Sequence, residues 1–467
     1  MPVLLPTLFQ LDNLAGRSLS TQEKDLLAIK YFYIYWQRKY NCSFCWWLME
    51  ENYDLTEPIN ELGNFYHWLC ADQHTQDNPQ NGAVHYLNVA TTKKKKTNAE
   101  RAMVIIRFMR HLIRQHISTK YLNESVHECK NARKNYLDAL DEISKSLKQL
   151  NKSSKSSGQS HIHGSVYKSI PNAMRKAVMV ICTPSTPSKP NKLNPFLPRA
   201  KWNRQFIQLR NDLILRLYFN YGLRRGELLL LGTNSYKMTA PSPSGERNYV
   251  LIVTNLEDNY IDPRSDEPSI KTEYSHRTLS LTKRDYLHLK GFCEQYRARL
   301  FENEDVEQHD VLFTASTAPY SPLSGSTIRD IFDVIDDSIA AHFPMFRDTT
   351  LYASLPNLTP SVARHTWAYE MLTYTYNEEY RKAIKMAAHT GQVLNEKEIM
   401  ENSVDKIRTL GGWSPRSDMP SHYGRRFFSE QANRKNIKRI VQDTEEIRRQ
   451  LEANIESEKT ENIFDEF

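Results

Sequence analysis

The sequence predicts a mainly α-helical protein with a small antiparallel sheet. Long segments repeat apolar residues at helical spacing, and only the short runs 249–254 and 278–281 have strand character. A serine-rich segment at 151–165 is typical of a linker between two such regions. At 467 residues, the chain is long enough for two or three domains, each with its own core.

The first 150 residues are predicted to be helical, and the stretch from Gln22 to Tyr40 is rich in aromatic residues. In the segment 98–116 one helix face is apolar and another carries three arginines, just after four lysines at 93–96. Two interpretations are open: a core helix with a solvated charged face, or a helix that holds a polyanion. The apolar positions are Ala102, Ile105, Ile106, Met109, Leu112 and Ile113, and the arginines are Arg107, Arg110 and Arg114.

A second amphipathic helix is predicted over 127–150. Its apolar residues follow a 4-3-4-3 spacing that suits packing inside the chain or against a partner. They are Tyr136, Leu140, Ile143, Leu147 and Leu150. After the linker, the segment 206–221 is a predicted helix, and 184–198, with its five prolines, is a second break in the pattern.

The charge is uneven along the chain. The net charge is +7 and the pI is about 8.8, but residues 443–467 contain nine acids and three bases, which leaves about +13 for the rest (7 + 6). A basic body with an acidic tail suits a polyanionic partner, with DNA as the first candidate. The acidic tail covers 441–467, and its part 444–467 is predicted to be a short helix with a ragged acidic tip.

Several protein classes are not expected. The segment 1–17 has no basic region before an apolar core, so a signal peptide is not predicted. No run of about 18 apolar residues occurs, so no membrane span is predicted. Six cysteines do not form a disulfide framework, which favours a reducing cytoplasm.

Three motifs precede a tyrosine in a recognisable order. They are Tyr221-Gly222-Leu223-Arg224-Arg225-Gly226-Glu227-Leu228, then Thr359-Pro360-Ser361-Val362-Ala363-Arg364-His365-Thr366, then Gly411-Gly412-Trp413-Ser414, and Tyr423 follows ten residues after Trp413. This ordered set resembles the tyrosine recombinase (phage integrase) family over about residues 200–430. The resemblance implies a helical core-binding domain at 1–150 and a catalytic domain at 166–440. Within the catalytic domain, 170–182 is similar to the first helix of the family and 184–198 is an implied loop.

The resemblance implies strand cleavage through a phosphotyrosine bond, with catalytic residues Arg224, Lys271, Arg364, Trp413 and Tyr423. Arginine forks match the phosphate oxygens on which charge grows, and Tyr423 is the implied nucleophile. Lys271, in a hairpin at 270–281, is the implied proton donor to the leaving oxygen. Glu227 is similar to a structural glutamate of the family, and Trp413 stands where many members have histidine.

Two departures from the family pattern concern the second arginine motif. Ser361 occupies a position where the family usually has histidine; it either contacts the phosphate or caps the helix that carries Arg364. His365 is adjacent to Arg364, but neighbouring helix positions diverge by about 100°, which favours a structural role. The segment 377–402 resembles an insertion.

The implied partners are double-stranded DNA with specific recombination sites and a homotetramer on that DNA, with accessory DNA-bending factors as further partners. The implied location is cytoplasmic and DNA-associated, and the reaction needs neither metal nor ATP. The implied biological setting is DNA integration for a mobile genetic element. Two alternatives stay open: a DNA-binding relative with impaired catalysis, and a topoisomerase or telomere resolvase with the same chemistry. In a DNA-binding protein of this kind, the arginine face at 107–114 would bind DNA.

A separate set of residues has the spacing of a zinc site. Cys42 and Cys45 precede His67 and Cys70. Strongly aromatic, helical surroundings favour thiols buried in a core, with zinc as the alternative.

Overall fold

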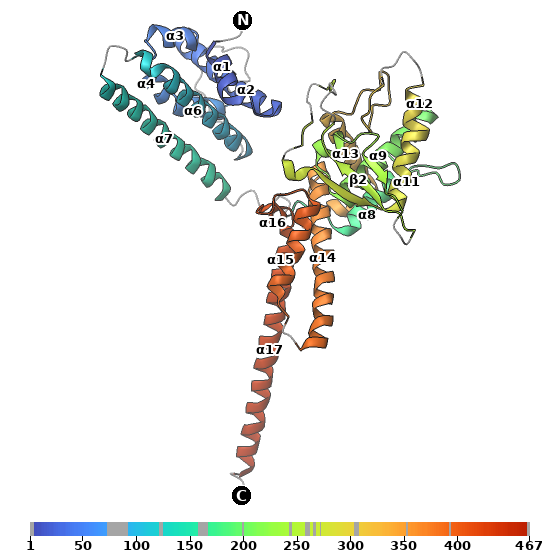
Figure 1. Ribbon diagram of the computed structural model, residues 1–467. Helices are drawn as coiled ribbons and strands as arrows, with labels where there is room; N and C mark the ends of the chain where they lie inside the picture. The colour runs from blue at the N-terminus through green and yellow to red at the C-terminus, as the bar shows by residue number, and fades with distance from the viewer. Residues whose placement is uncertain are drawn as a thin grey trace. The chain divides into compact units, whose positions relative to one another are not determined.

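The computed structural model describes residues 4–71, 92–120, 125–156, 167–198, 200–241, 245–256, 262–264, 268–270, 272–302, 308–351, 354–391 and 394–464. The chain divides into two units, Met1–Ile162 and His163–Phe467 (Figure 1). The division lies inside the segment 151–165 that the sequence marks as a linker. The predicted class, mainly helical with a small antiparallel sheet, is confirmed.

The first unit consists of helices around an aromatic core. Phe32, Trp36, Phe44, Phe65 and Phe108 are fully buried and contact one another in tilted or edge-to-face pairs. Its elements are α1 (Leu4–Phe9), η1 (Gln10–Leu14), α2 (Leu19–Tyr40), α3 (Phe44–Glu50), α4 (Thr56–Asn60), α5 (Leu62–Cys70), α6 (Thr92–Lys120) and α7 (Val126–Ser156).

Helix α6 is the central helix of this unit. All six apolar positions predicted for its inner face are buried. The three arginines of its other face are engaged inside the unit: Arg107 pairs with Asp25 at 2.7 Å, Arg110 pairs with Asp141, and Arg114 donates to Asn13. These contacts favour the structural interpretation of that face.

Helix α7 packs inside the unit, which agrees with the first of its two interpretations, packing inside the chain. Tyr136, Leu140 and Leu147 are buried, and Ile143 lies at the edge of the same core. The helix continues to Ser156, six residues past its predicted end at residue 150. The side chain of Leu150 lies outside the described residues.

The second unit surrounds a three-stranded antiparallel sheet of order β1-β2-β3. β1 is Tyr236–Met238, β2 is Tyr249–Val253 and β3 is Arg277–Leu281. Leu251 faces Leu279 across the β2–β3 ladder, and both side chains are buried. Strand β1 was not predicted, because its three residues are exposed or half-buried and carry no alternation.

Helices make up the rest of this unit, and the predicted helices at 170–182 and 206–221 correspond to α8 and α9. They are α8 (Asn172–Cys182), α9 (Lys201–Tyr221), α10 (Arg225–Leu229), η4 (Glu273–Ser275), α11 (Lys283–Gly291), η5 (Phe292–Arg297), α12 (Ala298–Leu300), α13 (Gly325–His342), η6 (Pro344–Arg347), α14 (Pro360–Thr390), α15 (Glu396–Leu410), α16 (Met419–Tyr423) and α17 (Arg425–Phe464). No helix in the described ranges is both long and apolar enough to cross a membrane.

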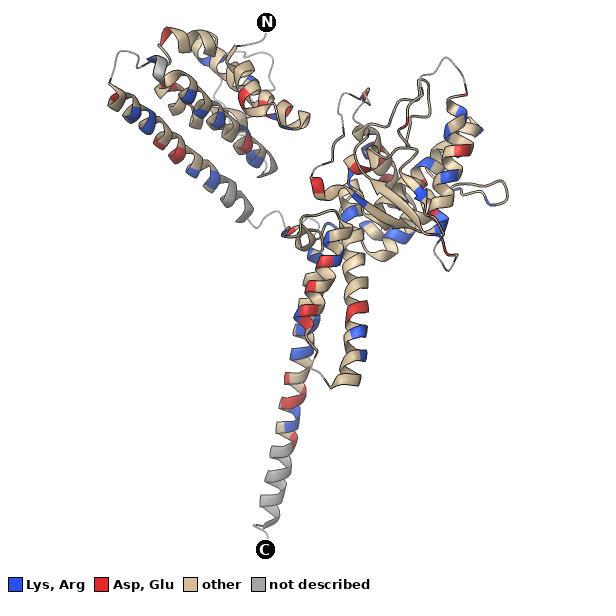
Figure 2. Ribbon diagram, viewed as in Figure 1, with Lys and Arg blue, Asp and Glu red and all other residues tan. Residues whose placement is uncertain are grey.

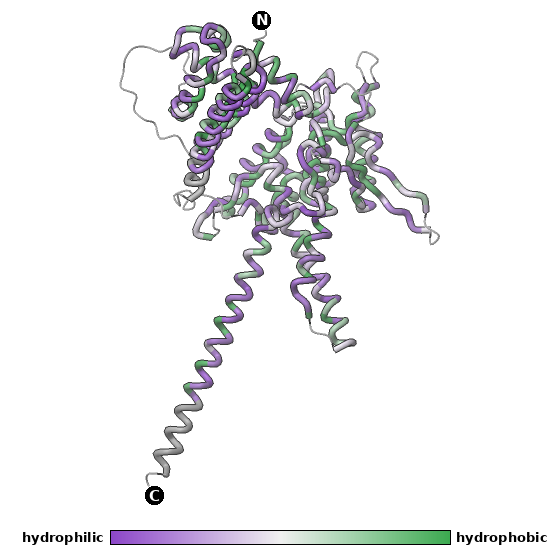
Figure 3. The backbone as a smooth tube through the Cα atoms, turned by 60° about the vertical axis from the view of Figure 1, so that its left-hand side comes forward, coloured by the Kyte–Doolittle hydropathy of each residue, from purple (hydrophilic) through white to green (hydrophobic). Residues whose placement is uncertain are grey.

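Three helices extend away from the sheet. Within the segment that resembles an insertion, 377–402, residues 377–390 form the distal part of α14 and residues 396–402 the start of α15, and the two helices pack against each other. Helix α17 continues past the end of α14 in both views (Figures 1 and 3). The expected short tail helix was wrong: as far as Phe464, the tail is the end of one 40-residue helix, because the segment is rich in Glu, Arg, Lys and Gln, which favour helix.

Candidate functional site

The first arginine motif forms a tight turn that fixes Arg224. Helix α9 ends at Gly222, whose φ of +61° belongs to the left-handed region. A Cβ atom there would lie 2.2 Å from the Trp367 ring, so the turn requires glycine. Arg224 then caps α10: its backbone N–H donates to Glu227 at 2.8 Å. The motif therefore sets both the position and the direction of the Arg224 side chain.

Glu227 is the acid that organises three arginines. Its side chain is 2 % exposed and contacts Arg224 at 2.5 Å, Arg277 at 3.0 Å and Arg364 at 3.8 Å. Burial alone would raise the pKa of Glu227, but Arg277 and the other guanidiniums outweigh it and lower the pKa. The ionised carboxylate thus holds the arginine cluster, defined as Arg224, Arg277, Arg364 and Glu227.

Arg364 connects the first and third motifs. Its guanidinium donates to the backbone oxygen of Gly222 and, at 2.6 Å, to that of Gly411. Burial and the nearby charge of Arg224 lower the pKa of Arg364 to about 9, so it stays cationic at pH 7. Its Cζ lies 4.7 Å from the centroid of the Trp413 ring.

Two buried donors in this region lack a partner. Arg364 Nε and Trp413 Nε1 are both inaccessible to solvent and have no hydrogen-bond partner among the residues that the structure describes. A buried donor left unpaired costs about 1–3 kcal/mol, so most such groups are paired in folded proteins. Both groups are well suited to an anionic oxygen acceptor.

Tyr423 lies beside these groups at the end of α16. Its ring centroid is 5.3 Å from the Trp413 ring, and Arg364 Cζ is 5.4 Å from the Tyr423 centroid. Arg224 reaches the same loop by donating to Gly412 O at 3.0 Å. The structure therefore brings Arg224, Arg364, Trp413 and Tyr423 together.

Lys271 lies outside the described residues, so its place remains a prediction. The neighbouring segment does reach the arginine cluster. Ser275 accepts a hydrogen bond from Arg224 at 2.8 Å, and Arg277 donates to Leu410 O at 2.9 Å. Sequence reasoning missed both residues; the signal available for Arg277 was a basic residue directly before the predicted strand 278–281.

His365 packs on the nucleophile candidate. The two ring centroids are 4.3 Å apart, and Nδ1 donates to the Tyr423 backbone oxygen at 3.2 Å, since a carbonyl can only accept. Burial lowers the pKa of His365 to about 4, so the imidazole is neutral at pH 7 and a weak base. Its contacts fit a role in positioning Tyr423.

Ser361 does not cap the helix that carries Arg364. Thr359 is the N-cap, and its hydroxyl accepts from Val362 N at 3.2 Å. Pro360 opens the helix and Ser361 follows it with an exposed side chain. The capping interpretation of Ser361 was wrong, because the preceding threonine takes that position.

The cysteines of the first unit have other neighbours. Cys45 Sγ lies 3.1 Å from the Tyr33 hydroxyl, and Asn98 donates to Cys70 Sγ at 3.8 Å. Within the described ranges, no group of three or more His, Cys, Asp or Glu residues is placed to bind a metal.

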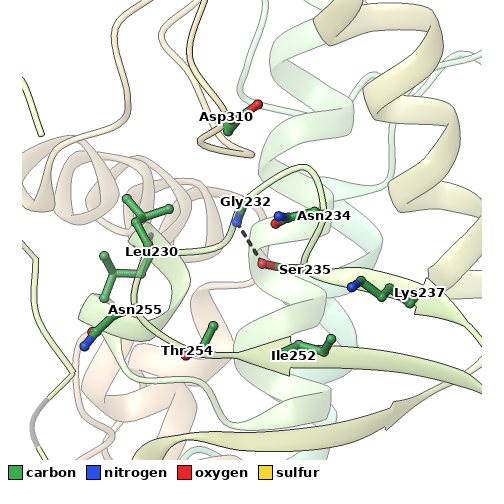
Figure 4. Close-up of a pocket in the computed structure, with 10 residues that line it drawn as sticks. Leu230, Gly232, Asn234, Ser235, Lys237, Ile252, Thr254, Asn255 and Asp310 are labelled. Carbon is green, nitrogen blue, oxygen red and sulfur yellow. Dashed lines mark hydrogen bonds between the residues drawn. The ribbon is translucent and has the colours of Figure 1, made fainter. Parts of the chain in front are cut away.

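A cavity of about 400 Å³ opens beside β1 and β2 (Figure 4). Its wall contains one cation, Lys237, and one carboxylate, Asp310; Ser235 Oγ accepts from Gly232 N at 2.8 Å. The arginine cluster and Tyr423 do not line it. The lining residues are Leu230, Gly232, Asn234, Ser235, Lys237, Ile252, Thr254, Asn255, Leu256 and Asp310.

Comparison with known proteins gives no relative: neither a protein-family model nor a curated protein sequence matches the chain.

Proposed function

We propose that this chain is a site-specific DNA recombinase that cuts and rejoins strands through a tyrosine. The observation that carries the proposal is the meeting of Tyr423 with Arg364 and Trp413, whose Nε and Nε1 donors are buried and unpaired. Residues from three distant motifs meet at this point, and their chemistry suits one scissile phosphate. The resemblance of the same motifs to tyrosine recombinases agrees with it.

In the proposed reaction, the Tyr423 hydroxyl releases its proton to water and its oxygen attacks the phosphorus. An O–P bond forms to the tyrosine as the bond from phosphorus to the 5′ oxygen breaks, and the leaving oxygen takes a proton to become a 5′-OH. Ionising a phenol at pH 7 costs about 4 kcal/mol, so nearby positive charge must offset it. Arg364, cationic and beside the ring, supplies that charge, and Lys271 is the proposed proton donor. Attack by a second 5′-OH reverses the step.

The arginines favour the transition state more than the ground state. Negative charge grows on the non-bridging oxygens during attack, and guanidinium forks in a buried site stabilise it without reorganisation. The Arg224 side chain is 20 % exposed, and its terminal nitrogens donate to Glu227, Ser275 and Gly412 O. In this proposal, DNA with specific sites is the substrate, a tetramer of the chain performs the exchange, and the first unit contributes to binding the duplex.

The test is covalent trapping on nicked DNA. A pool of nicked duplexes of randomised sequence is incubated with the full chain, and protein–DNA adducts are isolated and sequenced. The expected adduct joins Tyr423 to a 3′ phosphate, and Tyr423→Phe abolishes it while DNA binding persists. Tyr374→Phe is the matched control, because Tyr374 is 62 % exposed on α14. An adduct that persists in Tyr423→Phe would contradict the proposal.

A second candidate function is DNA binding without catalysis. Two observations favour it: both terminal nitrogens of Arg364 donate to backbone oxygens, and the histidine typical of the family is replaced by an exposed serine. DNA binding with no adduct on any nicked duplex would select this candidate. If adducts form, the products identify the reaction. A recombinase joins two DNA sites, a topoisomerase relaxes supercoiled circles, and a telomere resolvase converts replicated ends into hairpins.

A further inference from the structure

Helix α17 leaves the rest of its unit after Lys435. That side chain pairs with Glu396 at the start of α15. Beyond it, every hydrogen bond and ion pair described for α17 joins two residues of α17 itself. An isolated helix gains nothing from packing and is marginal in water.

This solitary part carries apolar side chains in a regular pattern. Ile437, Ile440, Ile447 and Leu451, with Thr444 between them, follow a 3-4-3-4 spacing, and Val441 borders them. The five apolar side chains are 48–60 % exposed. In Figure 3, hydrophobic (green) bands recur along the backbone of the projecting helix. We call these six residues the apolar stripe. A 3.5-residue average period is the pattern of helices that wrap around one another.

We propose that the apolar stripe binds the same stripe on other copies of this chain, as a parallel coiled coil in register. In heptad terms, Ile437, Thr444 and Leu451 take the a positions, and Ile440 and Ile447 the d positions. The association needs no DNA and does not depend on the proposed reaction. It also differs from docking of a tail onto a neighbour's catalytic unit, because the two partners present the same face.

The flanking charges select the parallel arrangement. Asp443 takes a g position and Arg448 the following e position, five residues later. In a parallel, in-register pair, g of one helix lies beside e of the other, so Asp443 meets Arg448 of the second copy, twice by symmetry. Both residues also hold exposed pairs within their own helix, Arg439–Asp443 and Arg448–Glu452, and both signs of charge flank the stripe (Figure 2).

The contact is expected to be weak between free chains. The stripe covers little more than two heptads, and Thr444 places a polar atom at its centre. Joining several chains on one DNA molecule would raise their effective concentration and strengthen the contact. Isoleucine at d accommodates more than two strands, so both a dimer and a tetramer contain the proposed contact.

Disulfide trapping tests the register on the full chain without DNA. Ile447→Cys is expected to form a disulfide between residue 447 of both copies, identified by mass spectrometry of the linked peptides because the chain has six native cysteines. Arg449→Cys is the control, since heptad position f faces away from the seam. Equal yields for the two variants, or a link from 447 to a different residue of the second copy, would overturn the proposal.

Charge exchange tests the partner and the direction. Asp443→Arg sets two arginines against each other across the seam, and Arg448→Asp sets two aspartates against each other. Each variant alone should weaken self-association roughly tenfold in sedimentation equilibrium. In a mixed pair of the two variants, the arginine introduced at position 443 faces the aspartate introduced at position 448, and the native Asp443 of one chain faces the native Arg448 of the other. Both sides then carry opposite charges, so an equimolar mixture should associate more tightly than either variant alone. The double variant, Asp443→Arg with Arg448→Asp, restores opposite charges on both sides and should regain association.

The double variant also controls for the loss of ion pairs within each helix. Each single variant loses one intrahelical pair, Arg439–Asp443 or Arg448–Glu452, and the double variant loses both. Restored association in the double variant therefore cannot come from the intrahelical pairs, and it isolates the contact between copies.

Two results would reject the inference. The first is a wild-type chain that stays monomeric throughout the micromolar range, which would show that the stripes do not bind each other. The second is a double variant that associates no better than the single variants, which would show that positions 443 and 448 do not pair in a parallel arrangement. Neither result bears on Tyr423 chemistry, which the trapping experiment measures separately.

Discussion

Glu227 is the residue on which the arginine cluster depends. Three guanidiniums face one buried carboxylate, and Arg364 is 2 % exposed, so water screens little of their charge. Repulsion among the arginines is balanced only while that carboxylate is ionised. The residue to which the family resemblance assigns a structural role is therefore also the one that keeps the cationic site stable.

Glu227→Gln should destabilise the second unit by about 3 kcal/mol, because removal of one partner leaves buried charge uncompensated. Urea unfolding of the full chain measures the free energy. Glu378→Gln, which breaks the exposed pair with Arg381, is the control and should change it by less than about 0.5 kcal/mol. Equal effects would show that Glu227 matters no more to stability than an exposed acid.

His365 should make the second unit sensitive to acid. Its pKa lies at about 4 in the folded chain, below the ordinary 6.5, so the unfolded chain takes up a proton first as the pH falls. The stability it contributes is present above pH 6.5 and is lost as the pH falls to 4, by up to about 3 kcal/mol. Urea unfolding at several pH values should show a smaller loss in His365→Gln than in the wild type. Parallel curves for the two proteins would contradict the assignment.

At the scale of elements, the start of α14 decides where Arg364 lies. Thr359→Ala should cost about 1 kcal/mol of stability, because the hydroxyl caps the helix, while Ser361→Ala should cost only a few tenths. Thermal melts measure both. The comparison also separates stability from chemistry at Ser361: a folded Ser361→Ala chain with a large loss in single-turnover cleavage would show that the serine reaches the phosphate.

The sequence predicted elements well where burial is one-sided. The faces of α6 and α7 follow their apolar periodicity, and β2 and β3 carry branched, buried residues. It failed where burial gives little signal. Strand β1 pairs through its backbone with little burial, and α17 continues along an exposed, charged segment whose length depends on helix propensity.

The site was predicted in part. The motifs identified Arg224, Arg364, Trp413 and Tyr423 as neighbours, and the structure places them together. The roles of Arg277 and Ser275 depend on how the segment after residue 271 folds back on α10, and no local pattern encodes that contact.

For the whole molecule, the separation into two units predicts independent folding. The hydrophobic core of the first unit shares no residue with the two clusters of the second. Cleavage of the chain between residues 157 and 166 should yield two folded fragments, each with its own cooperative unfolding transition. Calorimetry of the purified fragments checks this; a second fragment that unfolds without a transition would contradict it.

The steric contact between Gly411 and Trp413 limits how these two positions can change in evolution. A Cβ atom on Gly411 would lie 2.3 Å from the Trp413 ring, although the backbone of Gly411 is in a region open to any residue. A lineage therefore cannot gain a larger residue at 411 before it loses the indole at 413. Among chains that share this site, the two positions should show compensatory substitution, with glycine kept beside tryptophan and alanine or serine admitted beside a smaller ring. The order of those replacements is fixed by a single steric contact.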